Sequence, residues 1–472
     1  MGSVPENTLA QATAANHKLS TRGACGLLYR DVWGPREKSM GNPWSPANPS
    51  GTIILRLAEN SLMHDDIKAF MQEQINVHPT KHLTYSTGPR GSHRLRRAAA
   101  EYLNDGFQPR KTVTMDNIFI TPGVASAIDA LAWAICNEGE GILIPLPLYN
   151  GFVVDIANRS NVRVIGIRYE GIEGYSDLED LFHPGVNRRA IEAALRQAKA
   201  DGTTIRALLI SHPHNPLGRC YPPETLREFA ALCGENDLHF VSDEIYAKSV
   251  FVNTAVPEAA SFVSTLSLDL CDVLDPKFHH VLYGASKDFC ANGFRLGLVC
   301  TRNEGIMGAL SSISIFSWSP HVLQDIWAAM LENKQWLNNF LRKKTQLMQE
   351  NYVIATSFLR KHGIPFSEVT AGLFIWVDLR YLLWPHPVSQ QADYSVLKAT
   401  SSDASIYEHH ETRIANICIK NGVMIAPGHV YLAEEYGWFR LTFTVGKEAL
   451  QEGLDRLWRS IQEVERENSR SK

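Results

Sequence analysis

Short apolar runs recur between about residues 115 and 300, and stretches with helical periodicity separate them. Several runs are continuously apolar, which is typical of strands covered on both faces. The predicted strands are Ile118–Ile120, Gly141–Leu146, Arg163–Ile167, Ile205–Ile210, Leu238–Ser242, His280–Gly284 and Leu296–Cys300. The predicted helices are Ala125–Asn137, Arg188–Ala200 and Pro222–Glu235. This alternation predicts an α/β domain with a mainly parallel sheet.

The pattern changes after Pro320. Helical periodicity from Val322 to Leu359 predicts one long helix or two, leading to a second domain. Strand-like runs and a final helix follow at Leu373–Leu379, Val423–Ile425, Phe439–Phe443 and Lys447–Arg466. The polar stretch 381–411 interrupts them, and we expect it to be a surface insertion. The second domain is therefore predicted to be small and α+β.

The composition favours a folded, multi-domain chain. Of its 472 residues, 44% are hydrophobic and 20% are charged, so the chain can bury a large core. The formal net charge of −4 argues against a dominant electrostatic grip on nucleic acid. There is no run of about 18 apolar residues that would predict a membrane-spanning helix. The polar segment Met1–Ser20 lacks the apolar core of a secretory signal, so the expected location is the cytoplasm.

The cysteines and histidines do not indicate a metal site. None of the eight cysteines forms a Cys-x-x-Cys pair, and reduced thiols are expected. Three histidine pairs occur, without further ligands at the spacing of a metal site. These are His212 with His214, His279 with His280, and His409 with His410.

The segment from Tyr283 to Gly297 carries the strongest chemical signal. It reads Tyr-Gly-Ala-Ser-Lys-Asp-Phe-Cys-Ala-Asn-Gly-Phe-Arg-Leu-Gly, so Lys287 lies just past a predicted strand among small residues. A lysine in such a place can form a Schiff base with a carbonyl cofactor. Arg295 follows eight residues later and can bind a phosphate bidentately. A solvated loop lysine is the ordinary alternative for this segment taken alone.

Polar residues at the ends of two other strands strengthen the signal. Asp243 ends one predicted strand, and Tyr246 follows three residues later. Asn215, in an Asn-Pro-Leu-Gly turn, follows the preceding strand and offers an amide. Open α/β sheets bind ligands at the carboxyl edge, where these residues are expected to lie. A buried carboxylate there can hold a pyridinium nitrogen protonated, and a phenol can donate to a ring oxygen.

Two further loops could complete a cofactor site. Thr-Pro-Gly-Val-Ala-Ser at 121–126 follows a strand and opens a helix, whose free N–H groups would suit a phosphate. Tyr149 follows the next strand and could stack on a planar ring, although a lone aromatic residue is more often part of the core.

In order and type, these motifs resemble the fold-type I pyridoxal-5′-phosphate (PLP) enzymes of the aspartate aminotransferase superfamily, from about residue 48 to 445. The resemblance implies a three-layer α/β fold with a mainly parallel mixed sheet, plus a smaller α+β domain built from both chain ends. It also implies that Lys287 is the Schiff-base lysine and that Asp243 pairs with the pyridine nitrogen. The other implied cofactor contacts are Val124, Ala125, Ser126, Tyr149, Asn215, Tyr246, Ser286 and Arg295.

The same resemblance implies a homodimer in which Tyr85 reaches the neighbouring subunit's cofactor, and a role for Arg440 in binding the substrate carboxylate. It divides the chain into an N-terminal extension (1–47), the first part of the small domain (48–80), a large PLP-binding domain (81–335) and the rest of the small domain (336–472). One position departs from the family pattern. Gly284 stands where many members have a phosphate-binding serine, for which Ser286 could compensate.

The Leu-Ala-Glu-Asn sequence at 57–60 is similar to the signature of the 1-aminocyclopropane-1-carboxylate (ACC) synthase branch, as are 370–380 and 437–440. In that branch the glutamate equivalent to Glu59 lies beside the substrate's sulfonium. An ordinary helix-start glutamate is the alternative. Tyr29, in Tyr-Arg-Asp-Val-Trp, weakly resembles a segment near the substrate site and is a further candidate.

The leading hypothesis is a PLP enzyme that acts on S-adenosylmethionine by ACC synthase-like Cγ–S lyase or γ-substitution chemistry, with Lys287 as general base. An aminotransferase that passes an amino group to a 2-oxoacid would use the same residues. A non-catalytic PLP-fold protein is the third hypothesis, and the intact set of Lys287, Asp243 and Arg440 argues against it.

Overall fold

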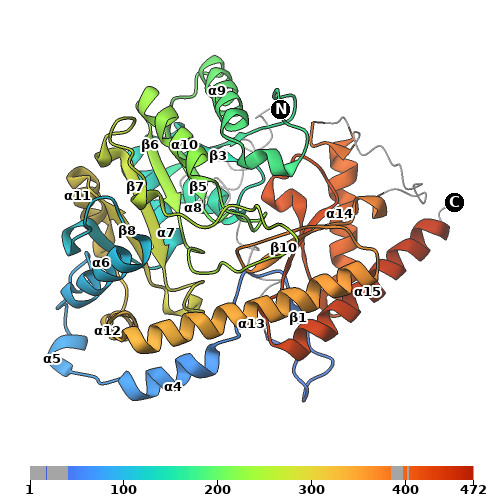
Figure 1. The fold of residues 1–472 in the computed structure, drawn as a ribbon, viewed down its shortest axis with the longest axis horizontal. Helices are drawn as coiled ribbons and strands as arrows, with labels where there is room; N and C mark the ends of the chain where they lie inside the picture. Colours follow the sequence, from blue (N-terminus) through green and yellow to red (C-terminus); the bar gives the residue numbers. More distant parts are fainter. Residues whose placement is uncertain (1–17, 19–40, 384–396, 401–402, 471–472) are drawn as a thin grey trace.

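The computed structural model describes residues 18, 41–383, 397–400 and 403–470. A seven-stranded sheet in the order β2-β8-β7-β6-β5-β3-β4 forms the centre of its larger part (Figure 1). Strand β8 is antiparallel to β2 and β7, and the other pairs are parallel. The strands are β2 (Ile118–Thr121), β3 (Gly141–Pro145), β4 (Arg163–Ile167), β5 (Ile205–Ser211), β6 (His239–Asp243), β7 (His279–Gly284) and β8 (Gly297–Thr301).

Each predicted strand of this sheet is present to within one residue at either end. The reason is burial on both faces, since every residue of β2, β3 and β8 is buried. Side chains alternate between the two faces: Leu282 and Val299 pack in one core cluster, whereas Val281 and Leu298 pack in another.

Helices cover both faces of the sheet, which confirms the predicted three-layer fold (Figure 1). One face carries α7 (Val124–Ile135), α8 (Gly151–Ser160) and α11 (Glu304–Ile313). The other carries α6 (His93–Phe107), α9 (Pro184–Ala200), α10 (Pro223–Glu235) and α12 (His321–Glu332). Helix α9 begins four residues before the predicted helix, with Pro184 in its first turn. Two short helices, α4 (His64–Gln74) and α5 (Pro79–His82), precede α6.

The smaller part contains an antiparallel sheet in the order β12-β13-β10-β9. Its strands are β9 (Phe366–Ser367), β10 (Phe374–Asp378), β12 (Ala426–Pro427) and β13 (Trp438–Thr442). Strand β1 (Ile53–Ile54) pairs in parallel with β11 (Val423–Met424), so an N-terminal segment joins the C-terminal elements. The helices here are α14 (Ala404–Lys420) and α15 (Lys447–Arg470).

The predicted surface insertion needs one correction. Its last residues, from Ala404 onward, form the first two turns of α14, where Tyr407 and Glu411 are buried. Buried side chains at that spacing fix the segment against the small core. Residues 384–396 and 401–402 of the predicted insertion lie outside the described residues.

Two helices, rather than a single long one, link the larger and the smaller part of the molecule. They are α12 and α13 (Lys334–Lys361), and they meet at Asn333, whose side chain caps α13 by accepting a hydrogen bond from the Trp336 amide at 3.1 Å. The first half of α13 packs Leu337 and Phe340 into the core beside the large sheet. Its second half packs into the core of the smaller part.

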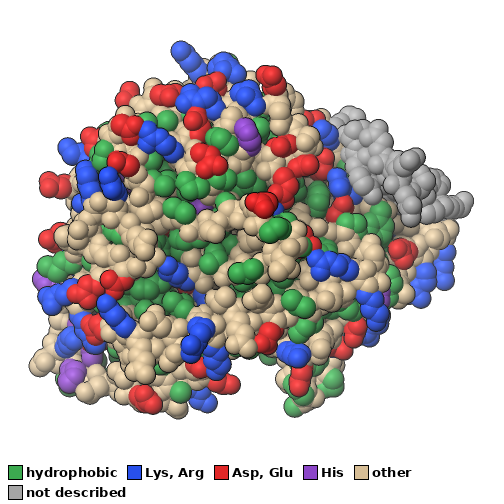
Figure 2. Space-filling model, viewed as in Figure 1, with side chains coloured by type: hydrophobic (Ala, Val, Ile, Leu, Met, Phe, Trp, Pro, Cys, Tyr) green, Lys and Arg blue, Asp and Glu red, His purple; other side chains and the backbone are tan. Residues whose placement is uncertain are grey.

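On the face shown in Figure 2, basic and acidic side chains are interspersed. None of the helices that the structure describes is both long and apolar enough to cross a bilayer.

Arg456 on α15 ties the N-terminal segment to the smaller part. Its guanidinium donates to the carbonyl oxygens of Pro49, Gly51 and Gly422 at 2.6, 2.7 and 3.0 Å. The side chain is buried, and its bond to Gly51 is shielded from water, while the other two bonds are partly buried.

Replacing Arg456 by Met should therefore lower the free energy of unfolding by about 3 kcal/mol, because a buried charged donor to three carbonyl oxygens is lost. Urea unfolding measures the change. Arg459→Met is the matched control, since Arg459 lies on the same helix and, like Arg456, pairs with Glu452, but is exposed. Equal stability of the two variants would contradict the anchoring role.

Candidate active site

Asp243 and Lys287 lie at the same edge of the large sheet. Asp243 is the last residue of β6, and Lys287 comes three residues after β7, the adjacent parallel strand. Burial raises the pKa of Asp243 to about 7, against which the Ile245 amide and the Lys287 ammonium act. Burial, followed by repulsion from Arg440, lowers the pKa of Lys287 to about 8. The Lys287 Nζ donates to the carbonyl oxygen of Ala58 at 2.6 Å.

Arg440 reaches this edge from β13 in the smaller part. Its guanidinium donates to Asn215 Oδ1 at 2.9 Å and to the carbonyl oxygen of Arg56 at 2.8 Å. It lies over the rings of Phe374 and Tyr431, at 4.7 and 4.9 Å from their centroids. Its Nε is buried without a hydrogen-bond partner. An unsatisfied N–H on a buried guanidinium suits an incoming carboxylate.

Tyr149 and Tyr246 supply two neutral phenols near this edge. Burial raises the pKa of Tyr149 to about 12 and that of Tyr246 well above its ordinary value. Both rings lie within the electrostatic reach of Asp243 and Arg440. The hydroxyls therefore remain protonated at neutral pH and can donate hydrogen bonds.

A close backbone approach forms the other end of the site. Helix α7 begins after Gly123, whose φ is +87°. A Cβ on Gly123 would lie 2.5 Å from an Arg295 guanidinium nitrogen, and one on Gly297 would lie 2.6–2.7 Å from the Gly123–Val124 backbone. The amides of Val124, Ala125 and Ser126 belong to the first turn of α7, where helix geometry leaves N–H groups available to an anion.

The structure also gives the reason for the glycine at position 284. A Cβ there would lie 2.7 Å from the carbonyl oxygen of Leu296 and 3.1 Å from the Gly297 Cα. A serine does not fit this backbone without a shift of residues 296–297. Ser286, the predicted substitute, is buried in the turn that carries Lys287.

The remaining residues predicted for the substrate or for the partner's cofactor lie in different surroundings. The carboxylate of Glu59 accepts a hydrogen bond from Asn292 Nδ2 at 2.5 Å and stabilises the ammonium of Lys287. Tyr85 is 88% exposed, with its ring edge-on to Trp318, and so lies apart from the buried group in its own chain. Tyr29 lies outside the described residues.

Sequence reasoning missed two residues. Asn292 lies within the lysine segment but becomes meaningful only through its contact with Glu59. Asp155, on α8, has a buried Oδ2 without a hydrogen-bond partner. Burial and repulsion from Asp129 raise the pKa of Asp155 to about 7, and Arg295 acts in the opposite direction. In the sequence, Asp155 stands six residues after Tyr149, and this spacing alone indicates no function. Its surroundings become apparent only when α7 and α8 are packed together.

Among the described residues, His82, His321 and Asp325 have potential metal-ligand atoms within 4.8 Å of one another. Lys81 donates to Asp325 at 2.6 Å, and the His78 amide donates to Nδ1 of His82 at 3.0 Å. The second bond puts the proton of neutral His82 on Nε2, the atom that a metal would need. In this arrangement the group is a hydrogen-bonded ion-pair cluster.

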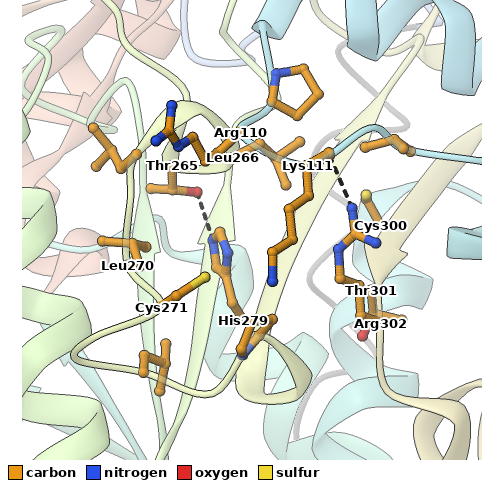
Figure 3. Close-up of a pocket in the computed structure, with 15 residues that line it drawn as sticks. Arg110, Lys111, Thr265, Leu266, Leu270, Cys271, His279, Cys300, Thr301 and Arg302 are labelled. Carbon is orange, nitrogen blue, oxygen red and sulfur yellow. Dashed lines mark hydrogen bonds between the residues drawn. The ribbon is translucent and has the colours of Figure 1, made fainter.

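A separate hollow lies at the opposite edge of the sheet (Figure 3). It contains His279, the first residue of β7, and Arg110, Lys111 and Arg302 on its walls. His279 Nε2 lies 2.9 Å from Thr265 Oγ1, and burial lowers the His279 pKa to about 4. None of the residues predicted for the cofactor lines this hollow.

Comparisons with known proteins agree with this geometry. The family described as Aminotransferase class I and II matches residues 52–457. A probable aminotransferase, tcpI, from Claviceps purpurea is 31% identical over 88% of this chain and 90% of its own length. A mouse protein called probable inactive ACC synthase-like protein 2 is 30% identical over 87% of this chain, which spans 66% of that protein.

Among solved structures, aspartate aminotransferase from Thermus thermophilus with maleate superimposes with a TM-score of 0.67 at 20% identity, covering 94% of this chain and 99% of that one. The chain therefore belongs to the class I and II aminotransferases, in their ACC synthase-like branch, and is a PLP-dependent protein of fold type I. The donor set fits this cofactor: a carboxylate, phenols, an arginine, helix amides and a lysine of lowered pKa converge at one sheet edge.

Asp155→Asn should stabilise the cofactor-free protein at pH 8 and have little effect near pH 4. The folded-state pKa of about 7 lies above the ordinary value of 3.8, so this carboxyl's contribution to stability is present below about pH 4 and lost as the pH rises to 7. An amide avoids burying the charge. Thermal melting of variant and parent across this range measures the difference.

Asp65→Asn is the control, because Asp65 is an exposed carboxylate in the first turn of α4. A melting-temperature difference for Asp155→Asn that does not change between pH 4 and 8 would contradict the burial argument.

Proposed function

We propose that the chain is an active PLP-dependent enzyme that removes the α-proton of an amino acid. The observation that carries this proposal is the convergence of Lys287, Asp243 and Arg440, three residues from different elements, at the carboxyl edge of the large sheet. In this proposal Asp243 holds the ring nitrogen, and Tyr246 and Asn215 hold the ring oxygen. Tyr149 stacks on the ring, and Arg295, Ser286 and the Val124–Ser126 amides hold the phosphate.

The side chains present suit this chemistry. When bound, PLP supplies an electron sink for the pair released at the substrate Cα. Lys287, with a pKa near 8, has an appreciable neutral fraction at physiological pH and can accept the α-proton. Arg440 orients the substrate through its α-carboxylate, and the neutral phenol of Tyr246 offers a proton to an oxygen.

The carboxylate of Glu59 favours a substrate with a positively charged side chain. Asn292 holds it, and it acts electrostatically on Lys287. S-adenosylmethionine meets this requirement, because its sulfonium can lie against a carboxylate. Lys287 would take the α-proton, and the Cα electron pair would form a bond to Cγ. The Cγ–S pair would leave with sulfur, so that the products are ACC and methylthioadenosine.

An aminotransferase is the second candidate, and the name of the Claviceps purpurea relative favours it. In that reaction the same lysine would accept and return a proton, the donor amino acid would leave as a 2-oxoacid, and its amino group would pass to a second 2-oxoacid. The mouse relative's name instead describes an inactive protein. The retained lysine, aspartate and arginine support catalysis here.

Incubation of the PLP-loaded protein with S-adenosylmethionine should release ACC and methylthioadenosine in equal amounts, detected by mass spectrometry. Parallel reactions with amino-acid and 2-oxoacid pairs test the second candidate. A new amino acid in those reactions, with no methylthioadenosine in the first, would replace the lyase proposal by the aminotransferase.

Borohydride reduction followed by peptide mapping should place the cofactor mass on Lys287. Lys287→Ala should abolish both this label and turnover, and Asp243→Asn should lower turnover by roughly 100-fold or more through a weaker electron sink. Lys277→Ala, at an exposed lysine, is the control. Full turnover in Lys287→Ala would refute the assignment.

We also propose a homodimer in which Tyr85 completes the partner's site. The high exposure of Tyr85 in one chain supports this arrangement. Coexpressed Tyr85→Ala and Lys287→Ala chains should regain about a quarter of wild-type activity, because half the dimers are hybrids with one intact site. No gain over the separate variants would contradict it.

A further inference from the structure

A fully buried ion pair lies directly behind the lysine loop. Lys344 and Asp288 are both 0% exposed, and the Lys344 Nζ lies 3.3 Å from Asp288 Oδ1. Lys344 belongs to α13, whereas Asp288 is the residue after Lys287. Neither residue contributes to the chemistry proposed above.

Donors fill the acceptor capacity of Asp288. Its Oδ2 accepts from the Lys248 amide at 2.7 Å and from the Tyr283 hydroxyl at 2.9 Å. Its Oδ1 accepts from the Ser249 hydroxyl at 2.7 Å and from Lys344. A carboxylate has about four lone-pair sites, and four donors from three chain segments occupy them.

Lys344 is equally well satisfied. Its three N–H protons have three acceptors: Asp288 Oδ1, the Asp288 carbonyl oxygen at 3.1 Å and Ser249 Oγ at 3.4 Å. The side chain and the backbone of the residue after Lys287 are thus both held by one ammonium. A completely satisfied polar network specifies a single arrangement of its members.

The loop around Lys287 is tight, so its residues move together. The Cys290 amide donates to the Lys287 carbonyl oxygen at 3.1 Å, and the Ala291 amide donates to that of Ala285 at 3.3 Å. Cys290 has a φ of +52°, in the left-handed region. A shift at Asp288 would therefore change the direction of the Lys287 side chain.

The Lys344–Asp288 ion pair also lies next to the smaller part of the molecule. Helix α13 changes its packing partner near Lys344, from Phe340 in one core cluster to Met348 in the other. The Ser249 carbonyl oxygen accepts from the Gly372 amide, just before β10, at 2.8 Å. Asp288 therefore lies where the large sheet, the linking helix and the small sheet join.

A contribution to stability does not by itself explain why an ion pair is buried here. Removing two charges from water is costly, and apolar residues of similar volume often stabilise a core as well. A buried ion pair whose hydrogen bonds are all formed also fixes the orientation of its groups, because its atoms have only one set of partners.

We propose that Lys344 and Asp288 are positioning residues that hold the Lys287 loop so that its amine faces Asp243 and the cofactor. This inference rests on the proposed role of Lys287. Lys344 acts only through Asp288 and does not touch the reacting atoms.

The test compares Lys344→Met with Lys343→Met. Lys343 is adjacent on α13 and forms an exposed ion pair with Asp66 at 2.8 Å, so it is a matched control. The PLP-loaded proteins are compared by visible absorbance and by circular dichroism of the bound cofactor. The rate at which PLP reattaches to the cofactor-free form is measured as well. Lys344→Met should reattach PLP about tenfold more slowly or worse, with an altered dichroism band, whereas the control should match the parent.

Lys344→Met leaves the Asp288 charge unpaired and can fail to fold. The double variant Lys344→Met with Asp288→Asn removes both charges and is therefore the deciding protein. A folded double variant, verified by thermal melting, with slow reattachment and an altered dichroism band supports positioning. The parent's rate and band in the double variant would overturn it.

The borohydride label separates the two levels of the argument. No label on Lys287 in the parent would refute the proposed function and this inference together. A label on Lys287 in the parent, with equal reattachment in all variants, would refute the positioning role alone.

Discussion

The contact on which the site depends is the hydrogen bond between Arg440 and Asn215. It crosses from β13 in the smaller part to the turn that follows β5 in the larger, and it joins residues 225 positions apart. Because the guanidinium is buried between Phe374 and Tyr431, its direction is set by both cores at once. The two sheets must therefore be correctly oriented before Arg440 can face Lys287.

The large sheet was predicted well because most of its strands are buried on both faces and so appear as short, continuous apolar runs, whereas β4 at its edge is mostly half-buried. The residues at its carboxyl edge followed from topology, since parallel strands end together. Helices α6 and α8 were missed. The centre of α6 is a run of three alanines, Ala98 to Ala100, which indicates no periodicity by itself, and only Phe152 and Ile156 of α8 are buried.

The remaining features of the site arise from contacts distant in sequence, which no local pattern reveals. Asn292 and Glu59, which form a hydrogen bond, are 233 positions apart in the sequence, and Lys344 and Asp288 are 56 positions apart. The pKa of Asp155 is raised first by burial and then by the approach of Asp129 on α7. A single sequence specifies which residues can do chemistry, but their partners depend on the three-dimensional packing.

The glycine at position 284 limits what the lysine loop can carry. Its backbone lies so near Leu296 and Gly297 that any side chain would collide with main-chain atoms. A serine introduced there is therefore not accommodated by a substitution at this position alone. It requires a prior change in the 296–297 backbone, which itself abuts Gly123 and Val124. A side chain at 284 would therefore disturb the start of α7 beyond Gly123 as well as its own strand.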